Sequence, residues 1–101
     1  MTPLFRAAQN GQFKICKLII ENVENKNPAR NDGQTPLHWA AEKGHLEVCH
    51  LIIENVQDKN PADHNGVTPL KNAKTANHTD IIELFKNITQ YRALKRVCNF
   101  L

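Results

Sequence analysis

The chain has 101 residues, which is enough for one hydrophobic core and too few for two ordinary domains. Hydrophobic residues make up 41% of it, but none of its apolar stretches approaches the roughly 20 residues that a membrane helix needs. The net charge of +3 is uneven: residues 1–83 hold nine basic and ten acidic residues, whereas residues 84–101 hold four basic residues and no acid. This predicts a nearly neutral body with a basic tail, and does not demand a nucleic-acid partner.

The cysteines and the N-terminus predict the compartment. The three cysteines are an odd number without the clustering of a disulfide framework, so we expect free thiols in a reducing compartment. The first residues do not have the basic region followed by an apolar stretch that marks a secretory signal. We therefore expect a cytoplasmic or nuclear protein.

An internal repeat dominates the sequence. The tripeptide Thr-Pro-Leu begins at Thr2, Thr35 and Thr68, a spacing of 33 residues. Residues 2–34 are identical to residues 35–67 at 18 of 33 positions, whereas residues 68–100 match residues 35–67 at only 7. Two similar copies followed by a divergent one are expected where the last repeat caps a stack.

Each repeat predicts two helices. Threonine can cap a helix through its hydroxyl group, and proline fits the first helical position because no hydrogen bond is lost there. Gly11, Gly44 and Asn77 are suited to the left-handed residue that ends the first helix. The second helix of the middle repeat has apolar residues at helical spacing from Leu46 to Ile53.

The second helices are expected to end at asparagine. Asn22 and Asn55 are predicted left-handed caps, with the following valine folding back onto the helix. The connecting segments 24–34 and 57–67 contain Asn-Pro and a closing glycine, and Asp32-Gly33 and Asn65-Gly66 supply turn residues.

The run from Thr35 to Val48, T-P-L-H-W-A-A-E-K-G-H-L-E-V, closely resembles the ankyrin-repeat signature. The resemblance implies an all-α fold, an ankyrin-repeat solenoid of stacked helix-turn-helix units joined by β-hairpin fingers. It places a single domain at 1–101, with repeats at about 1–33, 34–66 and 67–88. The family histidine His38, expected to be structural, is replaced by Phe5 in the first repeat and Lys71 in the third.

Residues 89–101 leave the repeat pattern. Tyr91, Leu94, Cys98 and Leu101 fall at helical spacing, which predicts an amphipathic terminal helix. We expect this helix to cap the third repeat, where Ile81, Ile82, Leu84 and Phe85 would otherwise form an open apolar face.

Metal binding and catalysis are both disfavoured. His45 and Cys49 stand four apart on one helix, which is ligand spacing in principle. However, Cys49 and Cys16 are repeat-equivalent and should fill the core, too far apart to form a disulfide. The chain contains no serine, and its four glycines form no phosphate-binding loop. We expect no metal, no cofactor and no enzymatic activity.

The resemblance implies a monomeric scaffold that binds a protein or peptide on its concave side. The variable positions of the fingers and first helices map to Arg6, Gln9, Asn10, Asn31, Asp32, Gln34, Trp39, Glu42, Lys43, His64, Asn65, Val67, Asn72, Thr75 and Ala76. For Trp39, core packing and surface display remain equally open. Two alternatives also remain: a structural segment of a longer array without its own ligand, and accessory binding of nucleic acid or an acidic surface through the basic tail.

Overall fold

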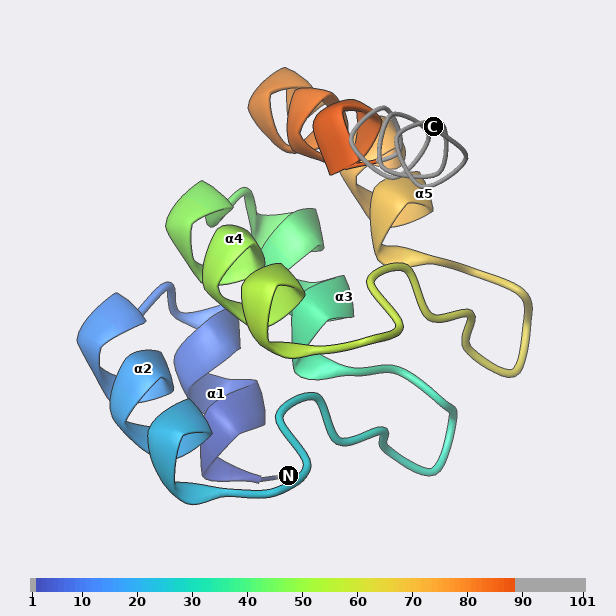
Figure 1. The fold of residues 1–101 in the computed structure, drawn as a ribbon. Coiled ribbons are helices and arrows are strands. Elements are labelled where there is room, and N and C mark those ends of the chain that lie inside the picture. The colour runs from blue at the N-terminus through green and yellow to red at the C-terminus, as the bar shows by residue number, and fades with distance from the viewer. Residues whose placement is uncertain (1, 89–101) are drawn as a thin grey trace, which may run out of the picture.

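The computed structural model describes residues 2–88 and consists of three helix pairs in two rows (Figure 1). The first pair is α1 (Pro3–Gln9) and α2 (Phe13–Asn22), and the second is α3 (Pro36–Lys43) and α4 (Leu46–Asn55). The third pairs α5 (Pro69–Thr75) with a helix that begins at Thr79 and continues through residue 88. The predicted terminal helix over 89–101 lies outside the described residues.

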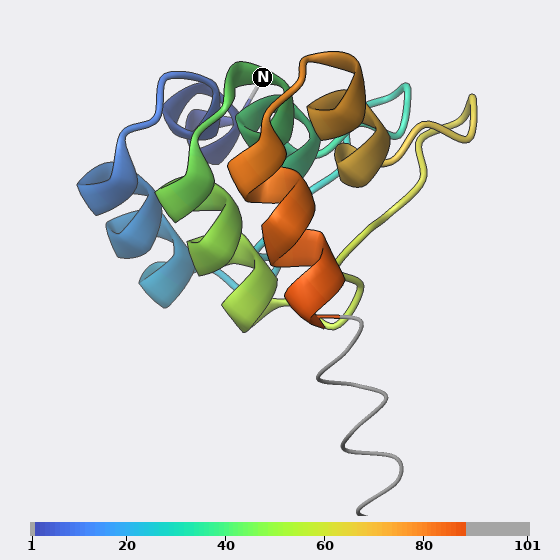
Figure 2. The same cartoon turned by 90° about the horizontal axis from the view of Figure 1, so that it is seen from above.

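The short helices α1, α3 and α5 form an inner row, and the longer helices form an outer row (Figure 2). Helix α3 packs between α1 and α5, and α2 packs on α4. None of the helices in the described part of the chain is long and apolar enough to cross a membrane.

The predicted starts of the inner helices are confirmed. The hydroxyl groups of Thr2, Thr35 and Thr68 each accept a hydrogen bond from the backbone nitrogen three residues later. A proline follows each threonine, and the threonine backbone is extended, as expected for a residue that precedes a helix. Threonine and proline therefore fix where each inner helix begins.

His38 reinforces the start of α3 and has the structural role expected of it. Its Nδ1 atom accepts a hydrogen bond from the backbone nitrogen of Thr35 at 3.0 Å, and its Nε2 atom donates to the backbone oxygen of Val67 at 2.8 Å. The ring is fully buried, and this burial lowers its pKa from the ordinary 6.5. A neutral imidazole thus joins the second helix pair to the loop that leads to the third.

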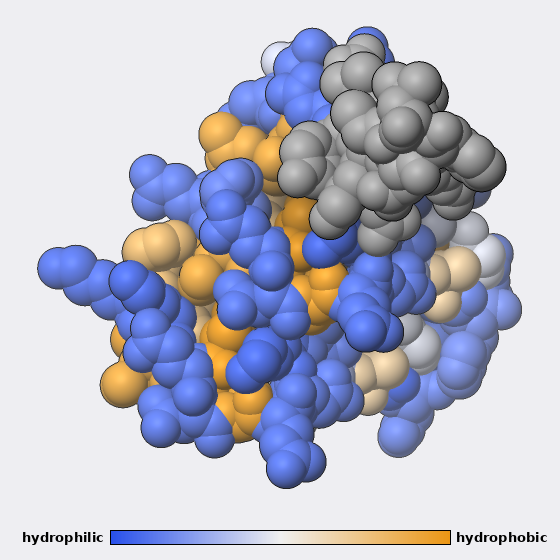
Figure 3. All heavy atoms as spheres, in the orientation of Figure 1, coloured by the Kyte–Doolittle hydropathy of each residue, from blue (hydrophilic) through white to orange (hydrophobic). Residues whose placement is uncertain are grey.

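The core lies between the two rows. Small residues of the inner helices, including Ala7, Ala8, Ala40, Ala41 and Ala73, are buried and let neighbouring helices approach closely. The outer helices contribute Cys16, Ile20, Cys49, Ile52 and Ile81. Between α2 and α4, apolar side chains also reach the surface (Figure 3).

The prediction of left-handed asparagine caps on the second helices is wrong. Asn22 and Asn55 are the last helical residues, and the valine after each is extended, with φ −123° at Val23 and −126° at Val56. The helix ends are instead satisfied by lysine. The Lys59 ammonium donates to the backbone oxygens of Ile53 at 2.6 Å and Val56 at 2.7 Å, and Lys26 has the equivalent contacts in the first pair.

The connecting segments form turns, and the expected β-hairpin is not confirmed, because the described residues contain no strand. In the first loop, the backbone nitrogen of Arg30 donates a hydrogen bond to the backbone oxygen of Gln34. The backbone nitrogen of Gly33 donates to the backbone oxygen of Arg30. The second loop repeats both bonds at the equivalent positions. We call these loops, residues 24–34 and 57–67, the first and second finger loops.

Candidate protein-binding surface

The most distinctive polar group on the finger side is the guanidinium of Arg30, in the first finger loop. Its Cζ atom lies 4.9 Å from the centre of the Phe5 ring and 5.2 Å from that of Trp39. The two rings meet edge to face, with centroids 5.9 Å apart. A cation this close to aromatic rings is attracted by their negative faces. We call Phe5, Arg30, Asp32 and Trp39 the Arg30 cluster.

Asp32 holds Arg30 in place. The Arg30 Nη2 atom lies 2.7 Å from Oδ2 of Asp32, and Oδ1 of Asp32 accepts a hydrogen bond from the backbone nitrogen of Gln34 at 3.0 Å. The hydrogen bond from Arg30 has the larger effect and that from the Gln34 backbone the next largest, and both lower the pKa of Asp32 below its ordinary 3.8. The charge pair is therefore intact at neutral pH.

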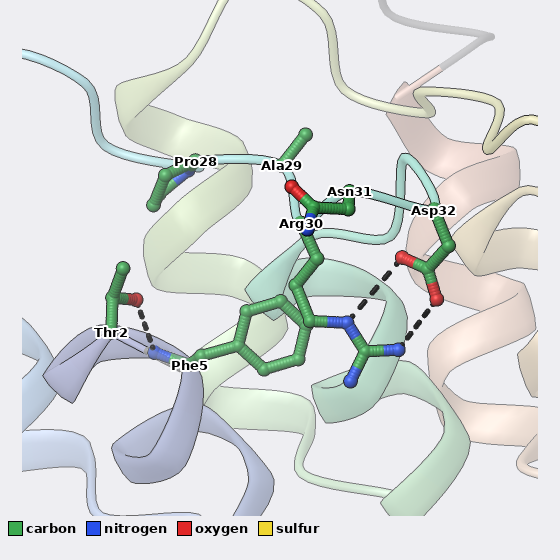
Figure 4. Close-up of a pocket in the computed structure, with 7 residues that line it drawn as sticks. All are labelled: Thr2, Phe5, Pro28, Ala29, Arg30, Asn31 and Asp32. Carbon is green, nitrogen blue, oxygen red and sulfur yellow. Dashed lines mark hydrogen bonds and ion pairs between the residues drawn. The ribbon is translucent and has the colours of Figure 1, made fainter.

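A hollow of about 620 Å³ lies beside this cluster, lined by Thr2, Phe5, Pro28, Ala29, Arg30, Asn31 and Asp32. Figure 4 shows the Arg30 side chain reaching across the Phe5 ring toward Asp32. The hollow joins an apolar floor from α1 and the first finger loop to one positive and one negative group. Such a mixture suits a peptide that presents both apolar and polar groups.

The second finger loop is fixed by a different residue at the equivalent position. Asp63 stands where the first loop has Arg30, and its Oδ1 atom accepts hydrogen bonds from the backbone nitrogens of Asn65 and Val67, both at 2.8 Å. These bonds, led by that from Val67, lower the pKa of Asp63. The two finger loops touch each other, because the backbone nitrogen of His64 donates a hydrogen bond to the backbone oxygen of Asp32 at 3.0 Å.

Trp39 is half-buried, between the two possibilities that the sequence left open. Its indole nitrogen is buried and has no hydrogen-bond partner among the described residues. An unsatisfied buried donor is unfavourable, and a ligand that offered an acceptor here would relieve it.

The structure places most of the fifteen predicted binding residues at the surface. Ten are exposed: Arg6, Asn10, Asn31, Asp32, Glu42, Lys43, His64, Asn65, Thr75 and Ala76. Five are half-buried: Gln9, Gln34, Trp39, Val67 and Asn72. Asp32, Gln34 and Trp39 gather around Arg30, and Asn72 donates a hydrogen bond to the backbone oxygen of His38.

Sequence reasoning missed two members of the Arg30 cluster, Arg30 itself and Phe5. A signal existed for both: Arg30 replaces the acidic Asp63 of the next repeat, and Phe5 replaces His38, within two otherwise similar copies. A charge reversal at equivalent positions is the more informative of these differences.

Cys16 and Cys49 are core residues, and His45 makes a structural contact. Cys16 and Cys49 are free and fully buried, and burial raises their pKa values to about 11 and about 12. The described part of the chain contains no group of three side chains placed to hold a metal ion. His45 instead donates from Nε2 to the backbone oxygen of Gln9 at 3.0 Å.

Comparison with known proteins agrees with this architecture. A family model described as ankyrin repeats (3 copies) matches residues 1–63, well over half of the chain. A search of curated protein sequences found no match. The family match, together with the stacked helix pairs and their shared Thr-Pro starts, leads to one conclusion: the chain belongs to the ankyrin-repeat family.

Proposed function

We propose that this protein is a non-enzymatic interaction module that binds a protein or peptide partner on the surface formed by its finger loops and inner helices. The Arg30 cluster is the centre of the proposed site. Arginine and tryptophan are enriched among the residues that dominate binding energy, and here they lie in contact beside an open hollow. Asp32 and Trp39, two of the fifteen residues predicted from the sequence, belong to this cluster, and the other thirteen are the proposed surrounding surface.

The Arg30 cluster is the observation that carries this proposal. A guanidinium stacked on two rings is pre-organised, so little side-chain freedom is lost when a partner binds. The adjacent Asp32 carboxylate offers an acceptor to a partner's donor groups. We therefore expect a partner segment that combines an apolar side chain with polar backbone or side-chain groups.

Affinity capture from a cell lysate tests the proposal when three immobilised forms are compared: the native chain, Arg30→Ala and Lys17→Ala. Lys17 is a matched control because it is basic, exposed and located on the outer helix α2. Proteins retained by the native chain and Lys17→Ala but lost with Arg30→Ala would support the proposal. Equal retention by all three forms would contradict it.

The two alternative functions lead to different results. A structural segment without its own ligand would retain no protein in an Arg30-dependent manner. Binding of nucleic acid or an acidic surface through residues 89–101, which lie outside the described residues, would weaken steeply with salt and would not depend on Arg30.

A further inference from the structure

The outer helix α2 stands at one end of the row of outer helices (Figure 2). Part of its apolar surface is uncovered. Ile15 is 46% exposed and Leu18 is 63% exposed. The two residues are three apart, so they lie side by side on the helix surface. Neighbouring exposed aliphatic side chains form an apolar patch of the kind that can bind another protein surface.

The next repeat shows what covers such a face. Val48 and Leu51 are the residues of α4 equivalent to Ile15 and Leu18, and they are only 1% and 9% exposed. Helix α2 packs against α4. The uncovered face of α2 therefore has the pattern of a surface that receives another outer helix.

The opposite end of the stack is built differently. The buried Ile20 and Ile53 correspond to Lys86 in the third pair, which is exposed. The His45 ring lies where a Cβ atom on Gly11 would be, with its Nδ1 atom only 2.5 Å from that position. The third pair has Asn77 at the position of Gly11, so its own Cβ atom obstructs a further histidine ring stacked in this way.

Charges beside the apolar face favour one arrangement of two copies. Lys14 and Glu21 are exposed and lie four residues before and three residues after Leu18. Neither forms an ion pair within residues 2–88. If two α2 helices met antiparallel about a two-fold axis near Leu18, Lys14 of each copy would lie beside Glu21 of the other. A parallel arrangement would place like charges together.

We propose that the face of α2 formed by Lys14, Ile15, Leu18 and Glu21 binds the same face of a second copy in an antiparallel, two-fold symmetric contact. This proposal replaces the monomer expected from the sequence, and it is independent of the binding site around Arg30. Because the contact is isologous, using the same face of both copies, assembly through this face stops at a dimer.

Sedimentation equilibrium of the full chain tests this proposal. Two large apolar residues per copy form a small contact, so we expect a weak dimer with a dissociation constant of roughly 10–100 µM. Leu18→Glu is expected to raise the dissociation constant at least about tenfold, since each dimer would bury two uncompensated charges. Leu18 is largely exposed, so the melting midpoint of this variant, measured at a concentration where both forms are monomeric, should stay near that of the native chain.

Charge exchange tests the antiparallel geometry. Lys14→Glu and Glu21→Lys are each expected to weaken the dimer about three- to tenfold, and the double variant should restore it to within about twofold, because the opposite charges face each other again. Lys17→Glu is the matched control: it makes the same charge change on α2, but Lys17 lies about 100° around the helix from Leu18 and on the side away from Ile15.

Three results would overturn the proposal. A full chain that stays monomeric up to about 1 mM, well above the expected dissociation constant, would leave this face to a neighbouring repeat of a longer array. Equal effects of Leu18→Glu and Lys17→Glu would place the contact elsewhere. A double charge exchange as weak as either single variant would exclude the antiparallel pairing.

Discussion

The Nε2 atom of His45 lies 3.0 Å from the backbone oxygen of Gln9, so a side chain of the second helix pair binds the backbone of the first. His78 makes the equivalent bond to the oxygen of Glu42 at 2.9 Å, and thereby joins the third pair to the second. Each ring occupies the space beside a left-handed glycine, Gly11 or Gly44. Glycine at these positions thus serves both the turn within one helix pair and the contact with the next.

Substitution of Gly44 separates these two roles. Gly44 has φ +80° and a Cβ atom there would lie 2.7 Å from the His78 ring, whereas Gly66 has φ +78° with no atom within 4 Å of that position. Gly66→Ala should cost only the left-handed strain, about 1 kcal/mol. Gly44→Ala should cost about 1 kcal/mol more, because the His78 ring must move, and Gly44→Val should cost at least as much. Denaturant unfolding measures this difference, and equal losses for the two alanine variants would show that the histidine contact is unimportant.

A second prediction concerns the lysine that binds the end of each outer helix. Lys59→Met keeps the apolar stem but removes both hydrogen bonds to the end of α4, so we expect a loss of about 1 kcal/mol. Lys17→Met is the control, since Lys17 is exposed and should change stability by less than about 0.5 kcal/mol. If both variants unfold at the same denaturant concentration, the ammonium does not stabilise the helix end.

His38 should make stability depend on pH. Burial lowers its pKa in the folded state below 6.5, so the unfolded chain binds more protons as the pH falls through 6.5. The contribution of this residue is therefore complete above pH 6.5 and declines below it, with a slope of at most about 1.4 kcal/mol per pH unit for one proton. In His38→Gln the decline between pH 7 and 5 should be shallower than in the native chain. Parallel curves for the two proteins would contradict this assignment.

The buried cysteines provide a probe of the core. Because burial raises the pKa values of Cys16 and Cys49, neither thiol should react with a thiol reagent at pH 8 faster than the chain opens. The measurement uses a Cys98→Ser background, so that only these two thiols remain. Cys49→Ser should destabilise the fold by about 1–3 kcal/mol, because it places a hydroxyl group in an apolar core. Rapid labelling of the folded protein would show that the outer helices separate readily.

The sequence predicts the helix starts well because their causes are local. Thr35 and His38 are three residues apart, and their capping contacts follow from that spacing alone. The ends of the outer helices were predicted incorrectly, since the lysine that satisfies them acts from six residues beyond Ile53. The Arg30 cluster was out of reach for a similar reason: it depends on a loop that carries Arg30 back to Phe5, 25 residues away in the sequence.

The most direct test of the proposed binding site is a titration of the captured partner, followed by the fluorescence of Trp39, the only tryptophan of the chain. Because Arg30 stacks on this ring, a partner that engages the cluster should change the emission as it binds. We expect such a change, with a dissociation constant that is raised at least about tenfold by Arg30→Ala and unchanged by Lys17→Ala. Binding of equal affinity to all three forms, with no change in Trp39 emission, would contradict it.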